Sequence, residues 1–339
     1  MGSGERIAVL GAGSWGTTLA IVLAENDHAV RLWEFLPEQA RALERERENR
    51  RFLPGVPIPD RVAVTADVDA ALDGAVMVVF VVPSHTVREV AVRVAASARF
   101  DRDAVIVNAA KGIEEGTVAR MSEVLREALG LDAGRILTLA GPSHAEEVSR
   151  HIPTSVTVAG SDPGPCRRVQ EVFARPYFRV YTNEDVVGVE IGVALKNCIA
   201  IAAGVIDGLG YGDNTKAALV TRGLAEIARL GEAMGASRET FSGLAGVGDL
   251  VVTCLSRHSR NRYVGEQIGK GKTLDEVLAG MVMVAEGVRT TRAAVALGQR
   301  FGVELPIIEM VHQVLFDGRD PREAIIALMT RPLRSEMPE

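Results

Sequence analysis

The chain has 339 residues, of which 47% are hydrophobic and 24% are charged, and its formal net charge is −6. This length allows two domains, and the acidic balance argues against nucleic acid or an anionic membrane surface as the main partner. The three cysteines lie far apart and form no Cys-x-x-Cys pair, so we expect reduced thiols in a cytoplasmic protein and no metal site.

The first predicted element is a strand, a glycine turn and a helix in direct succession. The apolar run 6–10 is followed by Gly11-Ala12-Gly13-Ser14-Trp15-Gly16 and then by an apolar helical segment. This order is the G-x-G-x-x-G fingerprint, in which Gly11 permits a tight turn, Gly13 admits a pyrophosphate, and Gly16 allows close helix packing. We therefore expect a dinucleotide here, with its pyrophosphate on the free N–H groups at the start of the helix.

The second predicted strand, residues 29–33, leads directly to Glu34, which lies 18 residues after Gly16. An acid at this place accepts hydrogen bonds from the adenosine ribose, and its charge repels a 2′-phosphate. We therefore expect NAD to be preferred over NADP. The alternative is that Glu34 is a solvated acid in a loop.

Short β-rich runs alternate with helical patterns through the rest of the first half. The run 76–82 is continuously apolar, which is typical of a strand buried on both faces of a parallel sheet. The alternation predicts an α/β, doubly wound (Rossmann-like) N-terminal domain. We expect strands at 62–65, 75–82, 104–108, 135–140, 154–158 and 178–182, and helices at 84–98 and 118–129.

Two loops that follow predicted strands carry polar side chains. The first contains Lys111, and the second is Gly141-Pro142-Ser143-His144-Ala145. Ligands of open α/β sheets bind beyond the carboxyl ends of the strands, so both loops are well placed. Lys111 alone is equally typical of an ordinary surface lysine. We assign no role to His144 or His85, because histidines in loops are commonly structural.

After about residue 185 the pattern changes to long segments with helical spacing, which predicts an all-α C-terminal domain. We place the division between residues 1–187 and 188–339, with a cleft between the domains. The segment 191–209 is very apolar but contains Lys196, Asn197 and Asp207, which favours a buried helix and argues against membrane insertion. Apolar helices in this half are compatible with a homodimer. We expect helices at 186–206, 216–234, 261–269, 287–301 and 307–316.

Lys196 is notable because Glu190 is the only other acidic or basic residue between 186 and 206. Desolvation lowers the pKa of a buried lysine toward the range that suits general acid–base catalysis. Asn197 adds a neutral donor and acceptor beside it. The alternative is that Lys196 buries its stem and extends its ammonium to the surface.

A second polar cluster contains Asp249, after Gly246-Val247-Gly248, and Ser259-Arg260-Asn261. An Asp after two glycines is typical of a helix cap. The Ser-Arg-Asn run begins a predicted helix, so hydroxyl, guanidinium and backbone N–H groups converge there on one anion. The planar fork of arginine suits phosphate oxygens. The alternative is a solvated basic turn.

In combination, these motifs resemble the NAD(P)-dependent glycerol-3-phosphate dehydrogenases, specifically the bacterial type. The resemblance extends from Gly11 to about Ala327. The motifs that carry it are Gly-Ala-Gly-Ser-Trp-Gly at 11–16, Val-Pro-Ser-His at 82–85, Lys111-Gly112, Gly141-Pro142-Ser143, Leu195-Lys196-Asn197, Thr221-Arg222-Gly223, Gly248-Asp249-Leu250, Ser259-Arg260-Asn261-Arg262 and Glu286-Gly287.

The resemblance implies reversible NAD(P)H-dependent reduction of dihydroxyacetone phosphate to sn-glycerol 3-phosphate, which feeds phospholipid synthesis. It implies that Lys196 transfers the proton and that Asp249 orients it. The implied substrate contacts, to which we add Asn197, are Lys111, Gly141, Ser143, Lys196, Asp249, Ser259, Arg260 and Asn261. The implied cofactor contacts beside the glycine turn are Ser14, Trp15, Phe35, Lys111, Ala145, Arg260, Val284 and Glu286.

One departure from the family pattern concerns the cofactor. Members often carry a small residue and then Arg or His where this chain has Glu34-Phe35, which weakens the case for NADP. Two other functions stay open from the residues alone. A dehydrogenase for a different hydroxy compound would need no Ser-Arg-Asn anion site, and a non-catalytic NAD sensor would not need Lys196 together with Asp249.

Overall fold

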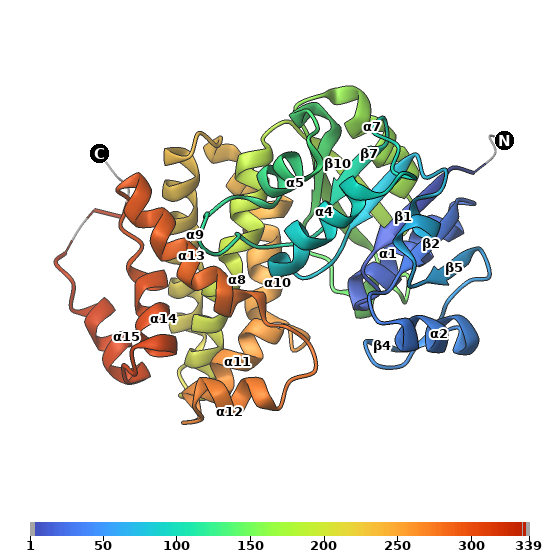
Figure 1. The fold of residues 1–339 in the computed structure, drawn as a ribbon. Coiled ribbons are helices and arrows are strands. Elements are labelled where there is room, and N and C mark those ends of the chain that lie inside the picture. The colour runs from blue at the N-terminus through green and yellow to red at the C-terminus, as the bar shows by residue number, and fades with distance from the viewer. Residues whose placement is uncertain (1–3, 334, 337–339) are drawn as a thin grey trace.

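The computed structural model describes residues 4–333, 335 and 336, and its two halves lie side by side (Figure 1). The first half forms an α/β domain and the second half a helical domain. Strand β10 ends at Asn183, and helix α8 begins at Val186. The expected fold class, a doubly wound domain followed by an all-α domain, is confirmed.

The α/β domain is built on an eight-stranded sheet with the order β10-β9-β8-β7-β6-β1-β2-β5. Neighbouring strands are parallel except β8 and β9, which are antiparallel. A short hairpin, β3 (Glu48–Asn49) and β4 (Leu53–Pro57), stands apart from the sheet. The sheet strands are β1 (Arg6–Leu10), β2 (Ala29–Trp33), β5 (Val62–Thr65), β6 (Met77–Phe80), β7 (Val105–Asn108), β8 (Ile136–Ala140), β9 (Thr154–Ala159) and β10 (Phe178–Asn183).

Helices cover both faces of this sheet, because successive strand residues point to opposite faces and both sets are apolar. In β1, Ile7 and Val9 belong to the core with α1 and α7, whereas Ala8 and Leu10 belong to the core with α4 and α5. The helices are α1 (Ser14–Glu25), α2 (Pro37–Glu46), α3 (Val68–Leu72), α4 (Val87–Ala96), α5 (Met121–Leu129), α6 (Ala145–Val148) and α7 (Pro163–Phe173).

The helical domain is arranged around α8 (Val186–Gly208), which lies at its centre next to the sheet domain (Figure 1). This helix is long and apolar enough to cross a membrane, but 94% of its most apolar window is buried inside the protein. It is therefore the core helix of this domain. The helices around it are α9 (Asp213–Ala233), α10 (Asp249–Leu255), α11 (Arg260–Gly269), α12 (Leu274–Ala279), α13 (Glu286–Phe301), α14 (Pro306–Phe316) and α15 (Pro321–Met329).

Three predicted helices begin three residues from the expected position, and those predicted from 261, 287 and 307 each begin one residue earlier than expected. The segment 84–98 starts with a 3₁₀ turn, Ser84–Thr86, and only then continues as α4. The helix predicted from 118 begins at Met121, because Val118 has a φ of 53°, which is incompatible with a right-handed helix. The helix predicted from 216 begins earlier, at Asp213.

The antiparallel pairing of β8 and β9 keeps their connection, residues 141–153, at one edge of the sheet. This edge is the carboxyl end of β8 and of the parallel strands beside it. A parallel pair would instead need a crossover to the other edge. The pairing therefore holds Gly141, Ser143 and Ala145 where ligands of open α/β sheets bind.

Helices α8 and α11 cross in direct backbone contact. A Cβ atom at Gly204 of α8 would lie 1.9 Å from the Arg262 carbonyl oxygen, and one at Gly265 of α11 would lie 1.9 Å from the Ile201 carbonyl oxygen. Neither glycine can carry a side chain without moving a helix. This contact fixes the N-terminus of α11 relative to α8.

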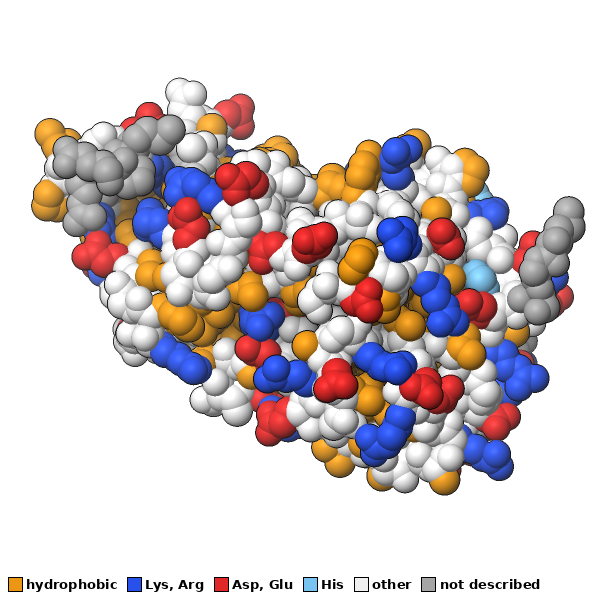
Figure 2. Space-filling view, turned by 90° about the horizontal axis from the view of Figure 1, so that it is seen from above, with side chains coloured by type: hydrophobic (Ala, Val, Ile, Leu, Met, Phe, Trp, Pro, Cys, Tyr) orange, Lys and Arg blue, Asp and Glu red, His pale blue; other side chains and the backbone are white. Residues whose placement is uncertain are grey.

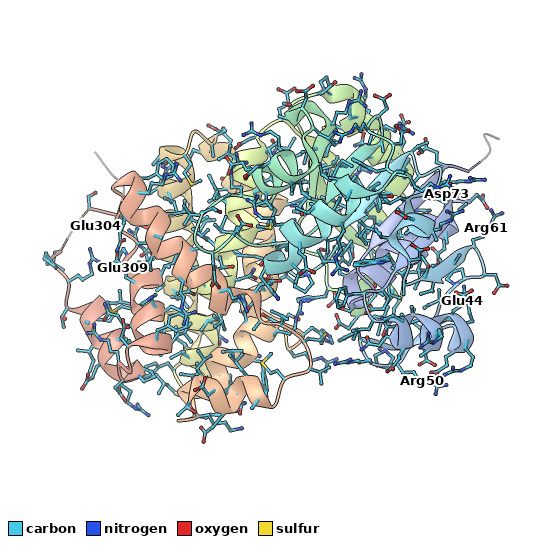
Figure 3. All side chains as sticks on the ribbon, viewed as in Figure 1. Glu44, Arg50, Arg61, Asp73, Glu304 and Glu309 are labelled. Atoms are coloured by element: carbon cyan, nitrogen blue, oxygen red, sulfur yellow. The ribbon has the colours of Figure 1, made fainter. Side chains whose placement is uncertain are left out.

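Charged side chains of both signs are interspersed on the face seen in Figure 2, without a large field of one sign. Those labelled in Figure 3 lie at the two ends of the molecule, with Asp73 and Arg61 at the end of the α/β domain. Asp73 pairs with Arg31 at 3.6 Å, and Arg61 pairs with Asp27 at 3.3 Å. Exposed pairs of this kind contribute about 0–1 kcal/mol each, so the fold depends on its apolar cores.

Candidate active site

A cavity of about 670 Å³ is lined by both domains. It contains the glycine turn that starts α1 and the side chains of Lys196 and Arg260 from the helical domain. Every expected site residue lines this cavity except Gly16 and Gly141, which lie directly behind it in contact with lining residues. The expected residues on its wall are Gly11, Gly13, Ser14, Trp15, Glu34, Phe35, Lys111, Ser143, Ala145, Lys196, Asn197, Asp249, Ser259, Arg260, Asn261, Val284 and Glu286.

The glycine turn has the geometry that a dinucleotide needs. Gly11 has a φ of 114°, and a Cβ atom at Gly16 would lie 1.8 Å from the Gly11 carbonyl oxygen, so neither position accepts another residue. Gly13 is the N-cap of α1 and has no side-chain cap, and a Cβ there would meet no protein atom within 4 Å. The uncapped N–H groups of α1 thus face open space, which fits a pyrophosphate.

Glu34 lies at the end of the cavity formed by β2 and α2. It is only 9% exposed, and its Oε1 accepts a hydrogen bond from the Leu36 N–H at 3.0 Å. Burial raises the pKa of Glu34, and the Leu36 N–H and the Arg51 charge oppose that rise. The alternative of a solvated loop acid is wrong. Phe35 beside it is half-exposed and packs edge-on against Trp33.

Lys196 is 5% exposed, so the alternative of an ammonium that reaches the surface is wrong. Its Nζ donates to Asp249 Oδ1 at 2.5 Å and to Thr253 Oγ1 at 2.6 Å. Burial lowers the pKa of Lys196 to about 7; the Asp249 carboxylate opposes this and the Lys111 charge adds to it. A lysine with a pKa in this range is suited to general acid–base chemistry near neutral pH.

Asp249 joins the two lysines of the site. It is the first residue of α10, after a π-helical turn over Leu244–Gly248, and it is 1% exposed. Its Oδ2 accepts a hydrogen bond from Lys111 Nζ at 2.8 Å, and the same Nζ donates to the Gly141 carbonyl at 2.9 Å. Burial alone would raise the pKa of Asp249, but Lys111 and Lys196 hold it below its usual range. Asp249 is thus an ion-pair partner, and its side chain caps no helix.

The start of α11 forms part of the cavity wall in the helical domain. Ser259 is the N-cap, and its Oγ accepts a hydrogen bond from the Arg262 N–H at 3.2 Å. The Arg260 side chain lines the cavity and makes no hydrogen bond or ion pair with any residue that the structure describes. A guanidinium fork and the first N–H groups of a helix are therefore available to one anion.

Two asparagines hold this helix start in place. Asn261 Nδ2 donates to Asn197 Oδ1 at 2.9 Å, and Asn261 Oδ1 accepts from the Gly287 N–H at 2.9 Å. These bonds link α11 to α8 and α13. The side-chain amides are therefore engaged with each other while both residues line the cavity.

Glu286 connects the helical domain to the α/β domain across the cavity. Its carboxylate accepts hydrogen bonds from the Ser84 backbone N–H at 3.0 Å and from Ser84 Oγ at 2.5 Å. Ser143 Oγ donates to the Gly141 carbonyl at 3.0 Å. Val284 and Ala145 contribute apolar wall between these polar groups.

Several residues of this site were not predicted from the sequence. Thr253 accepts a hydrogen bond from Lys196, and its spacing of four residues from Asp249 on one helix face was the available signal. Arg51 had no local signal, because only the fold brings it to the cavity, and the motif that contains Ser84 gave no sign of its bond to the distant Glu286. His144 also lines the cavity, and burial and the two lysine charges lower its pKa to about 4, which keeps its imidazole neutral.

The fold and this site define a two-domain NAD(P)-dependent oxidoreductase with a buried lysine at the substrate end of the cavity. The comparisons with known proteins give the family. Residues 6–165 match the N-terminal part, and residues 185–326 the C-terminal part, of the NAD-dependent glycerol-3-phosphate dehydrogenase family. The chain belongs to this family.

Similar curated proteins cover nearly the whole chain. The chain is 54% identical to glycerol-3-phosphate dehydrogenase [NAD(P)+] of Geobacillus kaustophilus, over 98% of this chain and 96% of that protein. It is also 54% identical to the protein of the same name from Prosthecochloris aestuarii, over 98% of this chain and 99% of that protein. The family that the sequence motifs indicated is confirmed.

A solved structure agrees in fold over the full length. The glycerol-3-phosphate dehydrogenase of Coxiella burnetii has a TM-score of 0.93 and 38% identity, and the match covers 97% of this chain and 100% of that one. More distant matches, such as a D-mandelate dehydrogenase with a TM-score of 0.61 and 11% identity, show the shared fold alone.

Proposed function

We propose that the protein catalyses the reversible reduction of dihydroxyacetone phosphate to sn-glycerol 3-phosphate and thereby supplies glycerophospholipid synthesis. The observation that carries this proposal is the placement of two unlike groups in one cavity. Lys196 is buried and ion-paired, whereas the Arg260 guanidinium lines the same cavity without a hydrogen bond or ion pair among the described residues, and only the charges of Glu286 and Glu146 act on it. A proton donor and a phosphate anchor are what a phosphorylated ketone requires.

The cofactor would be held along the cavity wall of the α/β domain. Gly11, Gly13 and the first turn of α1 would take the pyrophosphate, and Glu34 would face the adenosine ribose. Trp15, Phe35 and Val284 would supply apolar wall. When bound, reduced NAD(P) supplies a hydride to the carbonyl carbon of the substrate.

Lys196 supplies the proton that balances this reduction. Its ammonium stabilises the negative charge that grows on the carbonyl oxygen and transfers one proton to it, which leaves a neutral amine and a secondary alcohol. In the oxidation, the neutral amine takes the hydroxyl proton back. Asp249 and Thr253 orient the Nζ for this transfer, since both hold it at hydrogen-bond distance.

Arg260 and its neighbours position the substrate. The guanidinium and the N–H groups at the start of α11 bind the phosphate, with Ser259 at the N-cap and Asn261 in the first turn. Lys111 and Ser143 approach from the α/β domain. Fixing the phosphate holds the carbonyl near Lys196, which converts an encounter into an oriented complex.

We further propose that NAD is preferred over NADP. Glu34 is buried in the cavity wall, and its Oε2 has no hydrogen-bond partner among the described residues. A carboxylate at this point accepts ribose hydroxyls and repels a 2′-phosphate. Arg51 lines the same end and offsets part of this repulsion.

The experiment that tests the function is reduction of dihydroxyacetone phosphate with NADH and with NADPH, assayed side by side. Unphosphorylated dihydroxyacetone serves as the matched substrate. We expect oxidation of both cofactors with the phosphorylated ketone, a higher kcat/KM with NADH, and little reaction with dihydroxyacetone. No reaction with the phosphorylated ketone would contradict the function, and a clear NADPH advantage would contradict the assignment of Glu34.

Three coarser expectations remain proposals. We place the domain division at 187–188, and we propose cytoplasmic location, which the unpaired and buried state of the three cysteines supports. We also propose a homodimer, supported by exposed apolar side chains such as Ile326 and Met329 on α15. Light scattering on the purified protein tests the last of these; a monomer at micromolar concentration would contradict it.

A further inference from the structure

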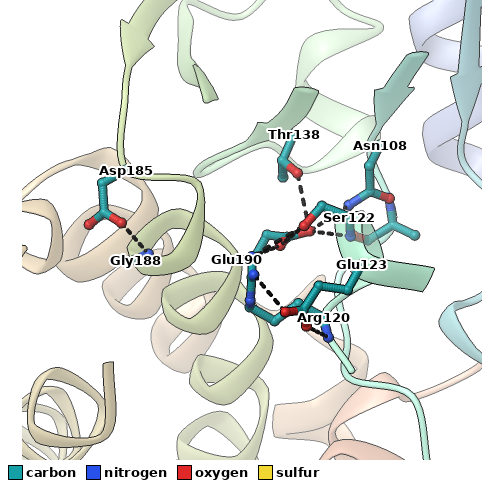
Figure 4. Close-up of polar contacts among 9 residues, drawn as sticks. Asn108, Arg120, Ser122, Glu123, Thr138, Asp185, Gly188 and Glu190 are labelled. Atoms are coloured by element: carbon teal, nitrogen blue, oxygen red, sulfur yellow. Dashed lines mark hydrogen bonds and ion pairs between the residues drawn. The ribbon is translucent and has the colours of Figure 1, made fainter. Parts of the chain in front are cut away.

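A buried carboxylate outside the cavity reaches from the helical domain into the α/β domain. Glu190 of α8 is 3% exposed, and Figure 4 shows its carboxylate among polar groups of the other domain. Its Oε1 accepts from the Ser122 N–H at 2.8 Å and Thr138 Oγ1 at 3.2 Å, with Asn108 Nδ2 at 3.4 Å. Its Oε2 accepts from Arg120 Nη1 at 2.8 Å and Ser122 Oγ at 2.6 Å. Burial raises the pKa of Glu190, and Arg120 and Ser122 oppose that rise.

The partners of Glu190 lead directly to the active site. Asn108 is the last residue of β7, and its side chain brackets the next loop, with Oδ1 accepting from the Ala110 N–H at 3.0 Å and Nδ2 donating to the Ala110 carbonyl at 3.2 Å. The following residue is Lys111. Thr138 lies on β8, whose end carries Gly141, the other partner of Lys111.

These contacts close a ring between the two domains. Glu190 and Lys196 stand on the same helix, six residues apart. One side of the ring runs from Glu190 through Asn108 to the loop of Lys111, and the other runs from Lys111 through Asp249 to Lys196. Losing the hydrogen bonds of Glu190 would therefore free the loop that carries Lys111 and weaken the contact between Lys111 and Asp249.

We infer that Glu190 is a positioning residue for the reaction: it ties α8 to the ends of β7 and β8 and so fixes the Lys111 ammonium against Asp249. This inference rests on the proposed function. Lys111 lowers the pKa of Lys196 by its charge and competes for the Asp249 carboxylate. When Lys111 withdraws, Asp249 is left to Lys196 alone, so the pKa of Lys196 rises.

The test compares two buried glutamates of the same domain. Glu190→Gln keeps the volume of the side chain, but its amide NH₂ group donates hydrogen bonds and would face groups that are themselves donors. Glu226→Gln is the matched control, because Glu226 is equally buried at 3% exposed and accepts from the Ile307 N–H at 2.9 Å, in the first turn of α14. Both variants are assayed for reduction of dihydroxyacetone phosphate across pH 5.5–9, a range of about two units around the pKa of Lys196, and their folding is checked by circular dichroism.

We expect the rate of reduction in the unmodified protein to fall as pH rises past the pKa of Lys196. In Glu190→Gln this falling limb moves upward by roughly half to one pH unit, and KM for the phosphorylated ketone rises about five- to tenfold. Glu226→Gln leaves the limb and KM unchanged. Ser122→Ala, which removes one donor and leaves the carboxylate in place, shifts the limb in the same direction by less.

An unmoved limb in a folded Glu190→Gln or Ser122→Ala protein overturns the inference, and so does an equal shift in Glu226→Gln. If Glu190→Gln does not fold, the Ser122→Ala result decides. Failure of the proposed function is a separate result, because it appears as absence of ketone-dependent NADH oxidation in the unmodified protein.

Discussion

One carboxylate, Asp249, serves two ammonium groups through its two oxygens. Lys196 is bound to Oδ1 and Lys111 to Oδ2. A buried ion pair gains little net stability over apolar packing, because desolvation offsets the attraction. The arrangement is better explained by chemistry, since burial lowers the pKa of Lys196 to about 7, Asp249 limits that fall, and Lys111 adds to it.

At Lys196, we expect replacement by alanine to lower turnover by roughly a hundred- to ten-thousandfold, the usual contribution of a positioned acid–base group. In the reduction, the proton donor is lost, so the falling limb of the pH profile near pH 7 disappears as well. Steady-state kinetics between pH 5.5 and 9, about two units on either side of neutrality, measure both effects. Turnover close to that of the unmodified protein would remove Lys196 from the mechanism.

At Arg260, we expect replacement by lysine to raise KM for dihydroxyacetone phosphate about tenfold or more, because a point charge replaces a bidentate fork. Arg257→Lys is the control, since this exposed arginine stands three residues earlier and does not line the cavity. Initial rates at varied ketone concentration give the comparison. An unchanged KM in Arg260→Lys would argue against phosphate binding there.

At Glu34, we expect replacement by glutamine to raise kcat/KM with NADPH by about tenfold while changing that with NADH little. Glutamine keeps an acceptor for the Leu36 N–H and removes the charge that opposes a 2′-phosphate. Glu38→Gln, an exposed position outside the cavity, should alter neither value. The same cofactor ratio in Glu34→Gln as in the unmodified chain would show that Glu34 does not set the preference.

At the scale of elements, the crossing of α8 and α11 decides where Lys196 and Arg260 stand relative to each other. Gly204 and Gly208 of α8 meet Gly265 and Gly269 of α11 with backbone against backbone. The two helices therefore cannot slide or separate without losing this contact. Helices α8 and α11 thus form one unit.

We expect Gly265→Ala to lower the free energy of unfolding by about 1–3 kcal/mol, because the new methyl group overlaps the Ile201 carbonyl. Gly280→Ala is the control, since its nearest neighbour atom would lie at an ordinary 3.7 Å. Urea unfolding of both variants measures the difference. Equal stability of Gly265→Ala and the unmodified protein would show that the helices can separate at no cost.

Some elements could be predicted from local sequence patterns, and other features could not. The strand–glycine–helix unit at 6–25 and the buried helix at 186–208 were predictable, because apolar periodicity and glycine chemistry act within a few turns. The antiparallel direction of β9 was not predictable, since a short strand buried on both faces has the same apolar pattern whether it runs parallel or antiparallel to its neighbour. The role of Asp249 was open as well, because a glycine turn before an acid is also typical of a cap. The contacts of Ser84 and Glu190 join residues far apart in sequence and had no local pattern.

At the scale of the whole molecule, the two domains are joined by polar contacts on either side of the cavity. Glu190 is bound to Arg120 and Ser122 on one side, and Glu286 to Ser84 on the other. The buried pair at Glu190 loses its compensation if the domains part, which costs several kcal/mol. We therefore expect the domains to unfold together.

Calorimetry tests this expectation through cofactor binding. NADH at about one hundred times its Kd stabilises the folded state by about 2.7 kcal/mol. For one cooperative unit of 339 residues, this raises Tm by about 4 °C. Two transitions, of which NADH moves only one, would show that the domains unfold independently.

The shared carboxylate described above has two ammonium partners, so Lys111, Lys196 and Asp249 together carry one net positive charge when both lysines are protonated, although the protein as a whole is an anion. Arg260 adds a further cation, and Glu146 and Glu286 on the same cavity wall offset it, while the chain carries a net charge of −6. At long range, the protein repels a phosphate ester, and attraction takes over only within about a Debye length of the pocket mouth. Sulfate and inorganic phosphate experience the same long-range repulsion and short-range attraction, so we expect these common buffer ions to compete with the substrate.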